Sequence, residues 1–228
     1  MARTAPRTAA FAQPATIVAR SLSDLTYELV RKRILAGDLA PGAPLRQDAI
    51  AEELGVSKIP LREALGRLEQ DGLLSSNRNR GYVVRPLSVD EAAEVFELRL
   101  KIEPAATADG ARAATDAQRA TATDALASLE RAQADGDLGE HIAMNRVFHL
   151  ALLRPCGSVT YQLLERLHIL AERYVRVHLE PSGREARARR EHRVLLRHWL
   201  ARDGDRLESL VADHIRAARD DLRLELGC

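Results

Sequence analysis

The sequence contains very little cysteine: Cys156 and Cys228 are the only two among its 228 residues, and they lie far apart. Two cysteines are too few for the disulfide framework of a small secreted domain or for a zinc site made of thiolates. Aromatic residues make up only 4% of the chain, so aliphatic side chains and alanine must fill its interior. The length is sufficient for two modest domains, each with its own core.

Long apolar runs are also missing. No stretch of about 18 consecutive apolar residues occurs, which excludes a membrane-spanning helix. The first 20 residues contain arginines but no continuous apolar segment before a cleavage site, so they do not resemble a secretory signal. We therefore expect a cytoplasmic protein without a membrane partner. Residues 1–20 are rich in Ala, Thr and Pro and lack periodicity, which predicts a mobile tail.

A large excess of one charge is absent as well, because the formal net charge is only +1. The charges are nevertheless distributed unevenly. Residues 1–88 carry 13 Lys and Arg against 9 Asp and Glu, whereas residues 89–228 carry 21 against 24. A basic N-terminal part on a near-neutral chain favours a polyanionic partner for that part, although this imbalance alone does not identify nucleic acid.

The N-terminal part has the element order of a winged helix-turn-helix. A capping-box-like start at Ser21 predicts a helix that ends at Gly37, and a short helix is predicted over 47–54. Ser57 begins a third helix, in which leucines recur at i, i+4 and i+7 (Leu61, Leu65 and Leu68). The apolar segments LLSS and YVVRP flank the polar turn NRNRG, which predicts a β-hairpin and the only strands of the chain.

Everything after Pro86-Leu87 is predicted to be helical. Ser88 with Glu91 forms a capping box, and further caps and glycine-bearing turns divide the rest into about six helices, at 89–113, 116–134, 138–154, 158–179, 184–202 and 205–225. Pro104 is expected to kink or break the first of them. The fold class is therefore mainly α, with a tail over 1–20, a winged helix-turn-helix over 21–87 and an all-helical domain over 88–228.

The third helix carries the residue types that read DNA. With its leucines buried, Lys58 and Arg62 (i, i+4) project together from its N-terminal half, which is the end that a recognition helix presents to base edges. Ser57 and the first-turn amides would face a phosphate. In the hairpin turn, Arg78 and Arg80 would reach the backbone or a minor groove. The alternative is that these cations are merely solvated, as most basic pairs on helices are.

The segment GVSKIPLREALGRLEQDGLL, preceded by ILAGDLAPGAPL and followed by RGYVV, closely resembles the DNA-binding domain of the GntR family. The resemblance covers about 65 residues. It implies that Ser57, Lys58, Pro60 and Arg62 touch operator DNA and that Gly81 lies at the tip of the wing. Lys58 replaces the commoner arginine, which removes a bidentate fork.

The later helices contain a histidine pattern that suggests a metal site. Asn145 and His149 are spaced i, i+4 on one helix, and His192 and His214 lie on two later ones. Metal sites in the interior of a helix bundle are built from side chains on several helices, and neutral imidazoles suit zinc, nickel or related ions. The alternative is that these histidines are hydrogen-bonded core or surface groups, as we assign the remaining four (His141, His168, His178 and His198).

The segments LRLKIEPAA, NRVFHLALL, REHRVLLRHWLARDGD and DHI resemble the FCD ligand-binding domain of the FadR subfamily, in its VanR-type branch. The resemblance spans nearly all of 89–226. It implies a divalent ion, zinc or a similar metal, held by Asn145, His149, His192 and His214, with Asn145 as a weaker ligand than the usual aspartate. It also implies four effector-binding candidates: Arg99, for the carboxylate of an effector; Glu103, for the effector or to hold Arg99; and, more weakly, Arg173 and Tyr174.

These patterns together predict a homodimeric regulator, most simply a repressor, that reads a palindromic double-stranded DNA operator and is released by a small organic acid bound near the metal. Three alternatives stay open. The metal itself is the effector, or the ligand is an acyl-CoA or another molecule bound without metal, or the histidines form a hydrolytic zinc centre. The last conflicts with the lack of a well-placed acid or base such as the Glu of HExxH, so we predict no enzyme activity.

Overall fold

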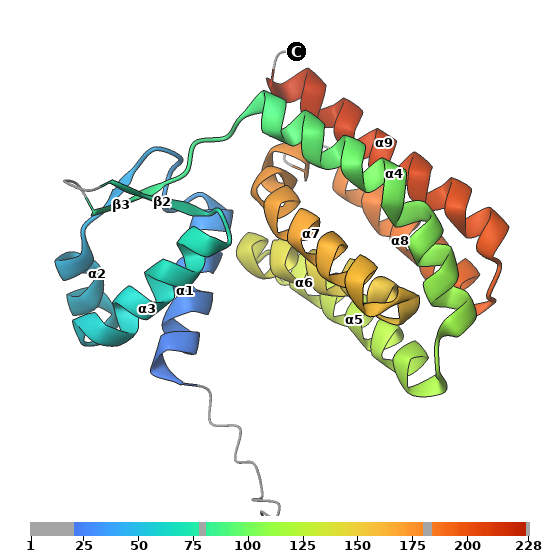
Figure 1. Ribbon diagram of the computed structural model, residues 1–228, viewed down its shortest axis with the longest axis horizontal. Helices are drawn as coiled ribbons and strands as arrows, with labels where there is room; N and C mark the ends of the chain where they lie inside the picture. Colours follow the sequence, from blue (N-terminus) through green and yellow to red (C-terminus); the bar gives the residue numbers. More distant parts are fainter. Residues whose placement is uncertain (1–20, 78–80, 180–183, 227–228) are drawn as a thin grey trace, which may run out of the picture.

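The structure is a computed structural model that describes residues 21–77, 81–179 and 184–226. Figure 1 shows two lobes joined by an extended segment. The N-terminal lobe contains α1 (Leu22–Ala36), β1 (Pro44–Leu45), α2 (Gln47–Leu54), α3 (Lys58–Gln70), β2 (Leu74–Asn77) and β3 (Gly81–Val84). The C-terminal lobe contains α4 (Val89–Ala113), α5 (Asp116–Ala134), α6 (Leu138–Leu153), a 3-10 turn (Arg154–Cys156), α7 (Ser158–Leu179), α8 (Arg184–Leu200) and α9 (Gly204–Leu226).

The first helix begins and ends where the sequence predicts. Ser21 and Asp24 form a capping box at the start of α1, and Gly37 ends the helix with a φ of 89°, a left-handed conformation that favours glycine. The leucine stripe of α3 is fully buried in the core of this lobe (Leu61, Leu65 and Leu68, each 0% exposed). The apolar face of α3 therefore packs inward, mainly against α1, and its opposite face is left to solvent.

The sheet has one strand more than predicted. Its order is β1-β3-β2 with antiparallel pairing throughout, so β3 lies between the other two strands. The hairpin of β2 and β3 agrees with the prediction, whereas β1 is only two residues long and has too little periodicity to be recognised from sequence. The pairing of Leu45 with Tyr82 ties the segment before α2 to the wing.

The C-terminal lobe is a bundle in which α4 lies alongside α9, and α5 alongside α6 (Figure 1). Its largest buried side chain is Trp199, whose indole nitrogen donates a hydrogen bond to the Leu152 carbonyl oxygen at 3.1 Å. Pro104 is buried inside α4, which continues as one helix from Val89 to Ala113, so of the predicted kink or break the break does not occur. Among the described residues, none of the helices has the length and apolarity needed to cross a membrane.

The two lobes share a buried interface at α1, α6 and α7. Ile142 of α6 is 0% exposed and belongs to the core cluster of the N-terminal lobe. Gly139 allows α6 to approach α1 closely, because a Cβ atom at this position would lie 2.5 Å from Cγ of Lys32. An ion pair between Arg31 of α1 and Glu172 of α7 lies beside these contacts. Because of these contacts, a movement of α6 or α7 would displace the N-terminal lobe.

Candidate DNA-binding face and metal centre

The N-terminus of α3 is exposed and unobstructed. Ser57 is its N-cap residue, with φ −74° and ψ 165°, and its side chain makes no capping hydrogen bond. The first-turn amides of α3 and the Ser57 hydroxyl are consequently available to donate hydrogen bonds to an anion such as a phosphate. Pro60 is half-buried in the first turn, where its missing N–H costs no intrahelical hydrogen bond.

Lys58 and Arg62 line one groove of about 730 Å³ together with Gly81, so the recognition helix and the wing face the same space. The Lys58 ammonium lies 2.7 Å from the Asp48 carboxylate, and a hydrogen bond from Lys58 lowers the pKa of Asp48. Both side chains are largely exposed, so this pair is weak and exchanges readily for a phosphate.

Two further residues of the groove were not among the predicted contacts. Arg46 lines it directly before α2, and the Gln47 side chain accepts a hydrogen bond from Nε of Arg62 at 3.4 Å. Arg46 adds a third cation that only the pairing of β1 with β3 brings beside the wing. Arg78 and Arg80, also predicted to touch DNA, lie outside the described residues.

The three predicted histidine ligands converge inside the C-terminal lobe. His149 comes from α6, His192 from α8 and His214 from α9, and one nitrogen of each lies within 4.8 Å of the others. Their ring centroids are 4.9–5.3 Å apart. Asn145, one helical turn before His149, lines the same cavity. Helix spacing and bundle packing thus bring all four predicted ligands to one place.

These residues fit a divalent ion. Zinc binds imidazole nitrogen at about 2.0–2.1 Å, so a small inward movement of the rings is enough to share one ion. Burial holds the pKa of His149 well below its usual 6.5, and the neighbouring rings of His192, His214 and His168 lower it further. His149 is therefore neutral near neutral pH, which is the form that binds metal. The amide oxygen of Asn145 is an acceptable but weaker fourth donor.

A carboxylate orients one ligand from outside the cluster. Nδ1 of His214 lies 2.6 Å from a carboxylate oxygen of Glu191. Such a carboxylate–histidine pair fixes the ring tautomer and raises the basicity of the nitrogen that faces the metal. Glu191 directly precedes His192 in the sequence, and its position next to a predicted ligand is the feature from which it could have been predicted.

A second polar cluster lies directly behind His149. The ring of His168 stacks on that of His149 at a centroid distance of 5.4 Å, and its Nε2 atom lies 3.1 Å from Glu103. Glu103 also accepts two hydrogen bonds from Arg99, at 2.7 and 3.1 Å. Burial acts to raise the pKa of Glu103, but the charges of Arg99 and His168 hold it well below 4.5.

Arg99 lines the histidine cavity, whereas Glu103 does not. Of the two roles considered for Glu103, the geometry matches the one in which it holds Arg99 in place. His168, which we assign to the hydrogen-bonded core or surface groups, is buried and paired with Glu103, and its ring also stacks on that of the predicted ligand His149. Nδ1 of His141 lies 3.4 Å from a carboxylate oxygen of Glu185, and Nδ1 of His198 lies 2.9 Å from one of Asp203. The side chain of His178 lies outside the described residues.

The histidine cavity is small. It encloses about 40 Å³, against about 30 Å³ for one water molecule in the liquid and about 300–1,000 Å³ for a typical ligand pocket. It therefore has room for an ion and about one water molecule in this conformation, and an organic acid requires it to open.

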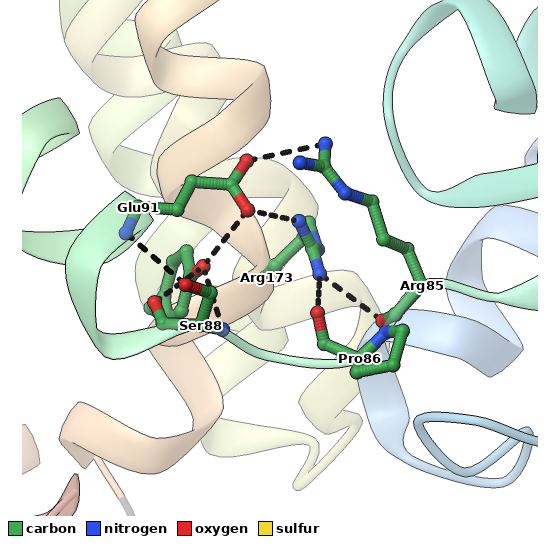
Figure 2. Close-up of polar contacts among 6 residues, drawn as sticks. Arg85, Pro86, Ser88, Glu91 and Arg173 are labelled. Carbon is green, nitrogen blue, oxygen red and sulfur yellow. Dashed lines mark hydrogen bonds and ion pairs between the residues drawn. The ribbon is translucent and has the colours of Figure 1, made fainter.

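Arg173 and Tyr174 do not lie where an effector-binding role requires them. Figure 2 shows Arg173 directed at the segment between β3 and α4, where it donates to the Arg85 carbonyl oxygen at 3.0 Å, to that of Pro86, and to Glu91 at 3.1 Å. The Tyr174 hydroxyl donates to the Ser88 carbonyl oxygen at 3.0 Å. The next residue of α7, Val175, is the one that lines the cavity. We therefore correct the assignment: both side chains hold the interdomain linker.

The fold and the DNA-binding face indicate a DNA-binding regulator in which a winged helix-turn-helix is followed by a helical domain. Comparison with known families agrees. The model for bacterial regulatory proteins of the gntR family matches residues 22–84, and the FCD domain model matches residues 94–217. The chain belongs to the GntR family, in the group whose DNA-binding domain is followed by an FCD domain.

Several relatives resemble the chain over most of its length. The uncharacterized HTH-type transcriptional regulator BphR of Paraburkholderia xenovorans is 30% identical over 87% of this chain and 84% of its own. The HTH-type transcriptional repressor GlaR of Escherichia coli is 27% identical over 83% and 90%. The relatives are transcription regulators and not enzymes, and this chain is a regulator of the same kind.

Solved structures show the same fold. E. coli McbR/YncC superimposes with a TM-score of 0.75 at 24% identity, covering 91% of this chain and all of that one. A GntR-type regulator from Rhodococcus sp. RHA1 gives a TM-score of 0.70 at 23% identity, with 90% and 98% covered. These superpositions cover both lobes, so the solved structures share the arrangement of winged domain and bundle described above.

Proposed function

We propose that this chain is a ligand-responsive transcription repressor that binds a two-fold operator as a homodimer and senses its effector in the histidine cavity. The observation that carries the proposal is the convergence of three imidazoles in the FCD domain. One of them lies on α6, whose Ile142 packs in the core of the winged helix-turn-helix. The similarity to GlaR, which is a repressor, supports the direction of regulation.

On the DNA side, the first turn of α3 enters the major groove. Arg62 and Lys58 reach base edges there, while the Ser57 hydroxyl and the adjacent amides contact a phosphate. Pro60 shapes that turn. The wing, with Arg78, Arg80 and Gly81, follows the backbone or the neighbouring minor groove. A two-fold dimer then requires a palindromic operator.

On the effector side, His149, His192 and His214 hold a divalent ion, zinc or nickel, with Asn145 as the fourth protein donor. A bound ion would supply Lewis acidity for a carboxylate oxygen of the effector. Arg99, held by Glu103 at the cavity wall, gives the same carboxylate a charge-assisted partner. The effector class is therefore a small organic acid.

Effector binding must move helices, because the cavity of about 40 Å³ is too small for an organic acid. Asn145 of α6 is followed by Arg146, whose Nε atom lies 3.2 Å from Glu172 of α7, and Glu172 in turn pairs with Arg31 of α1. Separation of the cavity walls thus displaces the surface on which the DNA-binding lobe rests. A coupling of about 1–3 kcal/mol, or 5- to 150-fold in operator affinity, is typical of such a linkage.

The test measures operator affinity by fluorescence anisotropy, with an operator selected from random duplexes. Zinc-loaded protein is titrated in the presence of a panel of short mono- and dicarboxylates, and at least one of them is expected to weaken DNA binding about tenfold. His192→Ala should abolish this response. His198→Ala, which removes a histidine outside the cavity, should leave it intact. A response that survives in His192→Ala would contradict the proposed site.

The small cavity also favours a second candidate, in which the metal is itself the effector. In that case zinc or nickel alone would change operator affinity reversibly, and no carboxylate would add to the effect. The same titration, run with chelated and metal-loaded protein before any acid is added, separates the two.

A further inference from the structure

The recognition helix carries one large apolar side chain that the described residues leave exposed. Ile59, the second residue of α3, is 72% exposed. The other strongly exposed apolar side chains of this lobe, Leu22, Leu25 and Leu29, are 41–51% exposed and lie on α1. Ile59 is thus the most exposed large apolar group among the described residues of the N-terminal lobe.

The direction of this side chain follows from helix geometry. Ile59 precedes the fully buried Leu61 by two residues, or about 200° of rotation, so it points away from the core. It follows Lys58 and lies one turn before Arg62, the two cations that line the groove beside the wing. Gly66, two turns later on the same outward face, adds no side chain, so Ile59 is the leading apolar group there.

A major groove offers a specific partner for such a group. The 5-methyl group of thymine is the apolar feature that the groove presents among the polar base edges, and apolar side chains read it by contact. A β-branched isoleucine has one strongly preferred rotamer on a helix, so little side-chain entropy is lost on contact. The cations beside it supply the attraction to phosphate that a methyl contact lacks.

We propose that Ile59 selects a thymine in the operator by packing on its 5-methyl group. The inference rests on the proposed function, in which the first turn of α3 enters the major groove. It adds a determinant of sequence preference that is independent of hydrogen bonding by Lys58 and Arg62.

The test uses the full-length protein and the selected operator. Each thymine is replaced in turn by deoxyuridine, which keeps every hydrogen-bonding group and lacks only the methyl. One position and its symmetry mate should each weaken binding by about fourfold, the equivalent of one buried methyl group. In Ile59→Ala and Ile59→Ser, affinity for the unmodified operator should fall, and the deoxyuridine penalty at that position should disappear.

Val159→Ala is the matched control, because Val159 is 79% exposed on α7 of the other lobe. This variant should keep both the affinity and the deoxyuridine penalty of the wild type. Tight operator binding with no sensitive thymine, or a penalty that persists in Ile59→Ala, would overturn the proposal for Ile59 and leave DNA binding by α3 standing. Failure of the wild type to bind any duplex would instead refute the proposed function.

Discussion

Arg31 of α1 and Glu172 of α7 form an ion pair that joins the two lobes, and their side chains are only 2% and 1% exposed. Glu172 accepts a second guanidinium, that of Arg146, at 3.2 Å. Burial raises the pKa of the Glu172 carboxyl, and the charges of the two arginines oppose that rise. The ionised form of Glu172 is therefore stabilised by its two arginine partners. Loss of either partner leaves a buried negative charge that is poorly compensated.

Arg31→Met is expected to destabilise the protein strongly, because it removes one partner of a buried pair while conserving most of the apolar stem. Breaking such a pair costs about 3–5 kcal/mol. The measurement is urea unfolding followed by circular dichroism. Arg33→Met is the control on the same helix, since Arg33 pairs with Glu53 at an exposed position and should contribute under about 1 kcal/mol. Equal losses in the free energy of unfolding for the two variants would show that the interdomain pair contributes no more to stability than the pair of Arg33 with Glu53.

Tyr174→Phe is expected to loosen the interdomain linker. The Tyr174 hydroxyl donates to the Ser88 carbonyl oxygen and accepts from the Ser88 amide at 3.3 Å. Its removal leaves the Ser88 amide without this partner at the start of α4, whereas the carbonyl oxygen keeps the hydrogen bond from the Ala92 amide at 3.0 Å. The cost should be about 1–2 kcal/mol. Hydrogen exchange should speed up at 85–88. Tyr161→Phe, whose hydroxyl pairs with Glu165 at a half-buried position, is the control and should leave that exchange unchanged.

Helix boundaries were the most predictable part of the fold, because their signals are local. Thr115 with Gln118 forms the full capping box that their spacing predicts. At Ser88 only half of the predicted box is present: its hydroxyl accepts from the Glu91 amide, whereas the Glu91 carboxylate pairs with Arg85 and Arg173. The strand β1 escaped prediction because two residues carry no pattern. Of the kink or break expected at Pro104, the break does not occur, since packing around a buried proline outweighs one lost backbone hydrogen bond.

The histidine cluster was predictable in part from helix spacing and in part from the resemblance to the FCD domain, but its surroundings were not. Asn145 and His149 share a helix face by spacing alone, whereas the contact of His168 with Glu103 depends on how α7 packs on α4. Choosing Val175 over Arg173 and Tyr174 required knowing which face of α7 meets the cavity, because adjacent helical residues differ by about 100° in direction. Single-sequence reasoning does not supply that rotation.

Gly110→Ala is expected to destabilise the bundle although alanine is the better helix former. A Cβ atom at Gly110 would lie 2.5 Å from the backbone oxygen of Leu152, which cannot rotate away. Overpacking of this kind costs about 1–3 kcal/mol. Gly66→Ala in α3 is the matched helical glycine, because its Cβ would meet only the Tyr82 hydroxyl at 4.0 Å. That variant should gain about 0.5–1 kcal/mol, and a gain in both variants would contradict the close approach of α4 to Leu152.

Metal binding is expected to stabilise the protein in a pH-dependent manner. The folded state holds the pKa of His149 well below 6.5, so the unfolded state takes up the proton first as pH falls. This group's contribution to stability is therefore present above about pH 6.5 and is lost as pH falls toward the folded pKa. Zinc competes with the same protons, so the rise in melting temperature that zinc produces should also fade below about pH 6. Melting curves with zinc and with a chelator, recorded across this range, measure the increment.

Variants of the four ligands then decide whether the ion sits in the histidine cavity. Asn145→Asp should bind zinc more tightly, because a carboxylate replaces a neutral amide oxygen, and its zinc-dependent rise in melting temperature should exceed that of the wild type. His192→Ala should lose the rise, whereas His198→Ala, with its histidine paired to Asp203 outside the cavity, should retain it. Elemental analysis of untagged protein after zinc reconstitution gives the stoichiometry, with about one equivalent expected in the wild type. Negligible zinc in the wild type, together with unchanged melting of His192→Ala, would identify these histidines as core polar groups that bind no metal.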